Sequence, residues 1–119
     1  MKQRTVILPK SFAHFFVVQL LIQSYVFPLG NYMFIETSYP RKRGDRARFE
    51  SEIFPPTPSN GRCMSFWYHM KGGHIGTLNV YMRIYGQSET KLWGMSLDQG
   101  DRWNSAVVPI LSGNRYYQV

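Results

Sequence analysis

Apolar and polar positions alternate in short runs through residues 31–119, a pattern typical of β-strands. The clearest alternation lies in residues 77–85, where every second side chain is apolar: Leu78, Val80, Met82 and Ile84. A strand with one buried face has this period of two, because successive side chains point to opposite faces of a sheet. We therefore predict a strand here that packs one face against a core.

Residues 62–70 carry large side chains on both of their alternating faces. One face holds Met64, Phe66, Tyr68 and Met70, and the other holds Cys63, Ser65, Trp67 and His69. Strands that are covered on both sides have such a composition. The run therefore predicts a central strand, and we expect both Phe66 and Trp67 to be buried.

Five further short runs, separated by turn residues, predict shorter strands, at residues 32–37, 47–51, 92–95, 103–110 and 116–119. Between the second of these runs and residues 62–70 lies a proline-rich stretch, residues 53–61, which we predict to be a loop because proline lacks the N–H that a sheet requires. No helical periodicity is convincing after residue 31. The chain is therefore predicted to be all-β, as a sandwich or barrel.

The first 29 residues differ from the rest and are expected to form a separate segment, with the domain occupying residues 30–119. A basic start with Lys2, Arg4 and Lys10 precedes an apolar stretch at residues 12–29. Three interpretations stay open: a secretory signal, a membrane anchor, or an apolar segment that packs on the domain. A signal lacks its small-residue cleavage site here, and an anchor would be slightly short and interrupted by polar residues.

Composition and charge narrow the function classes. The chain of 119 residues has room for one domain, and with 44% hydrophobic and 18% charged residues it is not of the disordered type. The net charge is +7, and much of the excess lies in one cluster: Arg41, Lys42, Arg43, Arg46 and Arg48. These five residues are candidate interaction residues for anionic glycans or lipids, although a solvated loop diluted by Asp45 and Glu50 has the same sequence. We do not expect nucleic-acid binding.

The residues that carry chemistry are sparse. Cys63 is the only cysteine, which excludes an intrachain disulfide and a zinc site made of several thiolates. The three histidines lack zinc-site spacing, and no serine lies in a nucleophile motif. Asp98 and Asp101 could offer oxygen ligands to a cation, but calcium sites need more ligands, and a solvated turn explains them better. We therefore expect no catalytic, metal or cofactor-binding site, and no enzyme.

Several strings of residues, in order and with constant spacing, resemble those of the MAM domain, a module named for meprin, the A-5 protein and receptor protein tyrosine phosphatase mu. They are residues 30–38, 40–41, 44–48, 55–57, 63–70 and 76–81, followed by Leu92-Trp93, Gln99-Gly100, Trp103, Ala106 and residues 117–119. The string Phe66-Trp67-Tyr68-His69-Met70 is the most specific of them. The resemblance covers nearly all of residues 30–119.

The resemblance implies a jelly-roll-like sandwich of two antiparallel sheets that is extracellular and not catalytic. It implies adhesion or interaction with proteins, including homophilic contact, on the cell surface or in a secreted protein. It also leaves open an accessory role beside the catalytic part of a membrane-bound protease or receptor phosphatase. Membrane association would come through the parent protein or through residues 12–29.

The sequence also departs from the family pattern, and we expect a partial module, truncated at both ends. The family domain begins well before Asn31 with an early cysteine pair, and it continues beyond the match to Val119 with a closing cysteine. By the resemblance, Cys63 would pair with that closing cysteine, so here it is expected to be a free thiol. At least two strands are expected to lack neighbours, and such edges promote aggregation.

Overall fold

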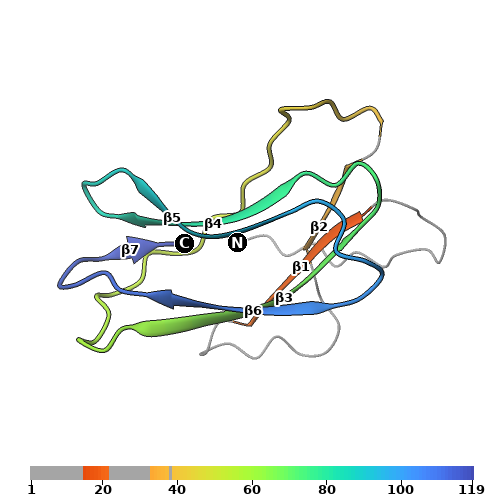
Figure 1. Cartoon of the computed structure of the whole chain (residues 1–119). Helices are drawn as coiled ribbons and strands as arrows, with labels where there is room; N and C mark the ends of the chain where they lie inside the picture. Colours follow the sequence, from red (N-terminus) through yellow and green to blue (C-terminus); the bar gives the residue numbers. More distant parts are fainter. Residues whose placement is uncertain (1–14, 22–32, 38) are drawn as a thin grey trace.

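The computed structural model describes residues 15–21, 33–37 and 39–119, and it contains strands and turns but no helix over these residues. The strands are β1 (Phe15–Leu21), β2 (Met33–Glu36), β3 (Arg62–Lys71), β4 (Thr77–Ile84), β5 (Glu89–Ser96), β6 (Asn104–Ile110) and β7 (Tyr117–Gln118). They form two layers (Figure 1). One sheet has the order β2-β1-β3-β6 and the other the order β5-β4-β7.

Every strand pair in the two sheets is antiparallel. The expected all-β antiparallel sandwich is therefore confirmed. β3 is the central strand that its composition predicted, because it pairs with β1 on one side and with β6 on the other. At the midpoint of β3, Phe66 is paired with Leu20 of β1 and with Ala106 of β6.

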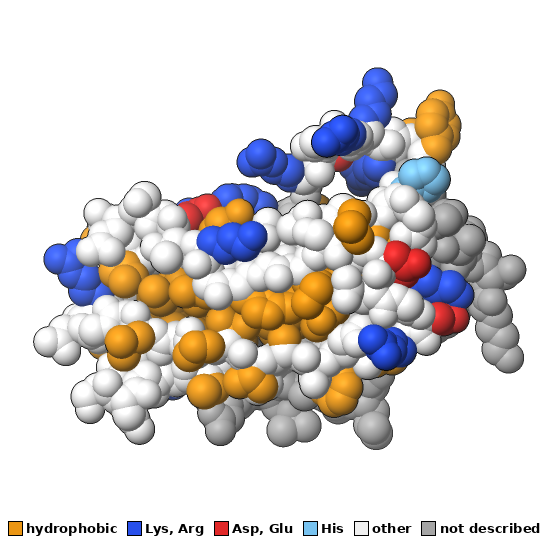
Figure 2. Space-filling model, in the orientation of Figure 1, with side chains coloured by type: hydrophobic (Ala, Val, Ile, Leu, Met, Phe, Trp, Pro, Cys, Tyr) orange, Lys and Arg blue, Asp and Glu red, His pale blue; other side chains and the backbone are white. Residues whose placement is uncertain are grey.

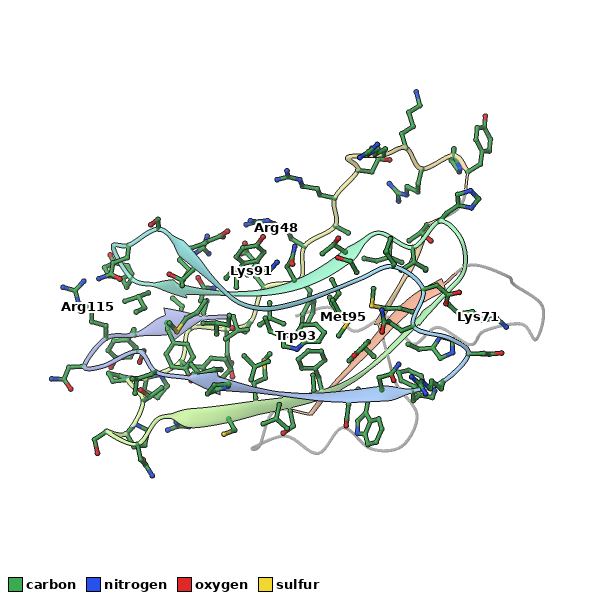
Figure 3. The ribbon with its side chains drawn as sticks, viewed as in Figure 1. Arg48, Lys71, Lys91, Trp93, Met95 and Arg115 are labelled. Carbon is green, nitrogen blue, oxygen red and sulfur yellow. The ribbon has the colours of Figure 1, made fainter. Side chains whose placement is uncertain are left out.

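The core lies between the two sheets and is built on one face of β3. Its members are buried hydrophobic side chains from both layers and from the loops between them: Met64, Phe66, Tyr68, Met70, Ile75, Met82, Val108, Ile110 and Tyr117. Trp93 and Met95 of β5 point into the same space (Figure 3). The Trp93 ring meets the rings of Phe66 and Tyr68 edge-on, with centroids 5.2 and 5.3 Å away. Burial of each such side chain stabilises the fold by about 1.5–3 kcal/mol.

The expected burial of Phe66 is confirmed, and that of Trp67 is wrong. Phe66 is 1% exposed, whereas Trp67 is 41% exposed. Adjacent residues of a strand point to opposite faces, and among the described strands a second sheet packs only against the inner face of β3. Trp67 therefore lies on the outer face of its sheet.

The strand predicted at residues 47–51 is also wrong, because these residues are irregular. This segment has no long ladder with a neighbouring strand. Instead it is held at its end by single contacts: the Ser51 N–H donates to the Val119 carbonyl oxygen over 2.8 Å, and the Val119 N–H donates to the Ser51 hydroxyl over 2.9 Å. The following loop, residues 53–61, forms an isolated antiparallel β-bridge between Phe54 and Tyr117.

β1 lies inside the apolar stretch at residues 12–29. It pairs with β3 from Phe15↔Lys71 to Leu21↔Ser65, and it also pairs with β2. A strand within the sheet is the arrangement that the packing interpretation of this stretch requires. The basic start, Lys2, Arg4 and Lys10, lies outside the described residues, and the division between residues 29 and 30 stays a prediction. No helix in the described part of the chain could span a membrane.

Candidate interaction surfaces

The five basic residues predicted as interaction candidates lie on a long irregular segment between β2 and β3. Every residue from 39 to 50 is exposed. Blue side chains crowd the part of the molecule that projects above the sandwich (Figure 2). The structure therefore displays these cations to solvent, but it does not treat all five alike.

Arg41, Lys42, Arg43 and Arg46 surround a tight turn. The Asp45 N–H donates to the Lys42 carbonyl oxygen over 3.0 Å, and the Lys42 N–H donates to the Asp45 carboxylate over 3.1 Å. Gly44 has a φ of 98°, a conformation that glycine adopts without steric cost. The turn is therefore closed twice, by backbone and by side chain, with Arg43 at its tip.

Arg48, the fifth candidate, is engaged with the sandwich. Its guanidinium donates to both carboxylate oxygens of Glu89 on β5, over 2.8 and 2.7 Å. This hydrogen-bonded pair raises the pKa of Arg48 and lowers that of Glu89. Arg83 and Glu50 extend the pair to a network, with an N···O distance of 3.5 Å between them. Arg48 lies beside the sheet of β4 and β5 (Figure 3), so it anchors the segment rather than projecting from it.

A second surface was missed by the sequence reasoning: the outer face of β3 and β6. The register sets Cys63 opposite Pro109, Ser65 opposite Val107 and Trp67 opposite Ser105. Trp67, Trp103 and Val107 are 41%, 43% and 63% exposed. We name this set, Trp67, Trp103 and Val107, the tryptophan face. Its signal was present in the alternation of residues 62–70, which set Trp67 on the face opposite Phe66.

Polar contacts close one end of the tryptophan face. The Asp101 carboxylate accepts from Lys71 Nζ over 2.7 Å and lies 3.1 Å from His69 Nε2. Lys71, and to a smaller extent His69, lowers the pKa of Asp101 through these hydrogen bonds. The rings of His69 and Trp103 lie 5.7 Å apart. This cluster holds the loop before β6 against the end of β3.

The sequence also singled out Asp98 and Asp101 as possible cation ligands, and Cys63 as a thiol. Asp98 accepts the Gly100 N–H over 2.9 Å, so Asp98 and Asp101 both have protein partners. Cys63 is a free, exposed thiol. The described residues contain no group of three or more His, Cys, Asp or Glu side chains that could hold a metal ion. The absence of a cofactor stays a prediction.

Two strands, β5 and β6, lie at the edges of their sheets. β5 and β6 each have one hydrogen-bonded neighbour among the described strands. A band of hydrophobic side chains runs along the face between the two sheets (Figure 2). The fold is thus an antiparallel two-sheet sandwich whose outer face carries exposed aromatic side chains.

Comparison with known proteins identifies the family. The model of the MAM domain, meprin/A5/mu, matches residues 24–119. The chain is 49% identical over 90 residues to MAM domain-containing glycosylphosphatidylinositol anchor protein 2 from Mus musculus, covering 68% of this chain and 10% of that protein. It is 47% identical over 85 residues to anchor protein 1 of the same name from Homo sapiens, covering 70% and 9%. Neuropilin-1 from Xenopus laevis is 35% identical over 92 residues, covering 76% and 10%. No solved structure matches significantly.

The chain belongs to the MAM domain family, as its resemblance indicated. The family match begins six residues before the boundary expected at residue 30. The chain spans about a tenth of the length of these curated relatives. The first two relatives are named for a glycosylphosphatidylinositol anchor, a lipid that attaches proteins to the cell surface. Their names support the expected location of this chain at the membrane or on its extracellular side.

Proposed function

We propose that this chain is a non-catalytic protein-interaction module of a cell-surface or secreted protein. Family membership and the anchor-protein names of its relatives support this function. A homophilic partner, meaning a second copy of the chain, is the version we favour for testing. The lack of catalytic activity is part of the proposal.

The observation that carries the proposal is the tryptophan face. Trp67 and Trp103 are each more than two fifths exposed on the same outer face, with Val107 beside them. In the register, Ser105 lies opposite Trp67, and Trp103 precedes Ser105 by two residues. Two side chains in such a diagonal relation lie about 7–8 Å apart, within reach of each other.

The chemistry of this face suits a protein partner. Tryptophan is enriched among the interface residues that contribute most to binding, because it offers a large apolar area with one N–H donor. Removal of such a patch from water is favourable by about 25 cal/mol for each Å² of apolar surface. In a homophilic pair, the same patch would be buried on both copies, as a two-fold symmetric interface requires.

Bead clustering tests this function. Beads coated with the full chain should cluster in solution, and beads carrying Trp67→Ser with Trp103→Ser should not. Tyr85→Ser is the matched control, because Tyr85 is 79% exposed in the turn between β4 and β5, away from the tryptophan face. Clustering of the double variant at the wild-type rate would exclude the tryptophan face as the binding site. If wild-type beads bind cells but do not cluster, the partner is another protein.

A further inference from the structure

The four cations of the turn, Arg41, Lys42, Arg43 and Arg46, have no carboxylate partner among the residues that the structure describes. The one acid within the turn, Asp45, is already used to accept the Lys42 backbone N–H. Arg48, by contrast, is matched by Glu89. The positive charge of the segment is therefore concentrated at its projecting end.

The shape of this segment is fixed at two points. The double closure between Lys42 and Asp45 sets the tip of the turn. The two-pronged pair of Arg48 with Glu89 fastens its stem to β5. Fixing a loop before binding reduces the entropy lost when a ligand is bound. Four cations within six residues thus form a positive surface whose backbone is held in place.

We propose that this turn binds a sulfated glycan chain through Arg41, Lys42, Arg43 and Arg46, and that Arg48 positions the turn without binding the glycan. The extracellular setting of this site rests on the proposed function above. Arginine suits the ligand, because its planar guanidinium donates two parallel hydrogen bonds to the oxygens of an anionic group. The turn is a convex, solvated surface, which fits an extended polyanion better than a small anion that needs an enclosed site.

An anionic membrane would also attract four clustered cations. However, lasting attachment to a membrane takes a second signal in addition to charge. Among the described residues 39–50, the exposed large apolar side chains are Tyr39 and Phe49, at 92% and 41%, and ten positions of the chain separate them. A sulfated glycan needs no such insertion, so the observations favour the glycan.

Binding of a defined heparin oligosaccharide to the full chain tests this site. The site variant replaces Arg41, Arg43 and Arg46 with serine, and the matched control replaces Arg62, Arg102 and Arg115, which are exposed elsewhere in the domain. Both variants lose three positive charges. We expect the site variant to bind about tenfold more weakly or worse at physiological salt, and the control to stay within about twofold of wild type. Circular dichroism checks that both variants are folded.

Each other outcome overturns the proposal. Equal weakening of the two variants would mean that heparin senses net charge alone. Unchanged binding of the site variant would exclude the turn. If the site variant loses binding to vesicles of phosphatidylcholine and phosphatidylserine but keeps heparin binding, the turn is a lipid site. Because bead clustering depends on the tryptophan face, failure of the glycan site and failure of the protein interface are observed separately.

Discussion

Thr57 and Ser112, which lie 55 residues apart in the chain, exchange hydrogen bonds in a buried site. The Thr57 N–H donates to the Ser112 hydroxyl over 3.0 Å, and the Ser112 N–H donates to the Thr57 hydroxyl over 3.0 Å. They are the two buried polar residues of the described part of the chain, 7% and 4% exposed. The exchange joins the proline-rich loop to the end of β6.

Removal of either hydroxyl should destabilise the domain. Thr57→Val leaves the Ser112 N–H buried without an acceptor, and Ser112→Ala does the same to the Thr57 N–H. An unsatisfied buried donor costs about 1–3 kcal/mol. Urea unfolding of the two single variants and the double variant measures this cost. Both single variants also lose the 3.5 Å contact between the two hydroxyl groups, so the double variant should lose slightly less than the sum of the singles. Strict additivity would show that this hydroxyl contact contributes nothing.

Two glycines with positive φ should differ in their tolerance of alanine. Gly113 has a φ of 63° and open space around its added Cβ, whereas Gly61 has a φ of 77° and its Cβ would lie 2.9 Å from the Ile110 carbonyl oxygen. Gly113→Ala should therefore cost about 1–2 kcal/mol from backbone strain alone. Gly61→Ala should cost clearly more, because the backbone of Ile110 must move. Equal losses in thermal unfolding would contradict the close approach of Gly61 to Ile110.

Truncation of two neighbouring aromatic residues of β3, Phe66 and Trp67, should destabilise the domain to very different extents. Phe66→Ala removes a ring that is 1% exposed and in contact with Trp93, and a large-to-small change in a core costs about 3–5 kcal/mol. Trp67→Ser removes a ring that is 41% exposed on the outer face, so it should destabilise the domain clearly less than Phe66→Ala. Chemical denaturation compares the two variants, and a loss in Trp67→Ser as large as that in Phe66→Ala would contradict the exposure of Trp67 on the outer face.

Two ion pairs should make stability depend on pH in the acidic range. The fold lowers the pKa of Glu89 through Arg48, and the pKa of Asp101 through Lys71 and then His69. A carboxyl group with a lowered pKa stabilises the fold fully above its ordinary pKa, and this contribution is lost as the pH falls through the lowered value. Glu89→Gln and Asp101→Asn should therefore melt below wild type at pH 6.

The difference in melting temperature between these variants and the wild type should shrink towards pH 3 and below, because both carboxylates become protonated in the wild type as well. Glu52→Gln is the control, since Glu52 forms none of the ion pairs found in the described residues. Melting curves recorded by circular dichroism across this range suffice. A deficit that persists unchanged at low pH would mean that the two carboxylates act through packing rather than charge.

The strands were largely predictable because their signal is local. Alternation located β4 within one residue, and the two-faced composition of residues 62–70 correctly identified β3 as central. The strand expected at residues 47–51 is absent because a short run between turn residues does not reveal whether a neighbouring strand is present to pair with. Trp67 failed for a related reason, since the sequence shows which face it shares but not whether that face is covered.

The sequence shows the basic segment as a cluster of positive charge. It does not show which of the five cations pair with carboxylates. Arg48 differs from Arg46 in its carboxylate partners: Glu89, which lies 41 residues beyond it in the chain, and Glu50, at an N···O distance of 3.7 Å. The sequence therefore predicted a candidate set of five residues. The structure divides this set into four cations that have no carboxylate partner among the described residues and one, Arg48, that pairs with Glu89.

Oxidative footprinting of the chain, dilute and then clustered on beads, tests the central proposal most directly. Trp67 and Trp103 should be oxidised readily in the dilute chain and become protected on clustering, whereas the half-buried Trp93 should react equally in both states. That pattern would locate the interface on the outer face of β3 and β6. Equal oxidation of Trp67 and Trp103 in both states, with protection appearing elsewhere, would contradict the account.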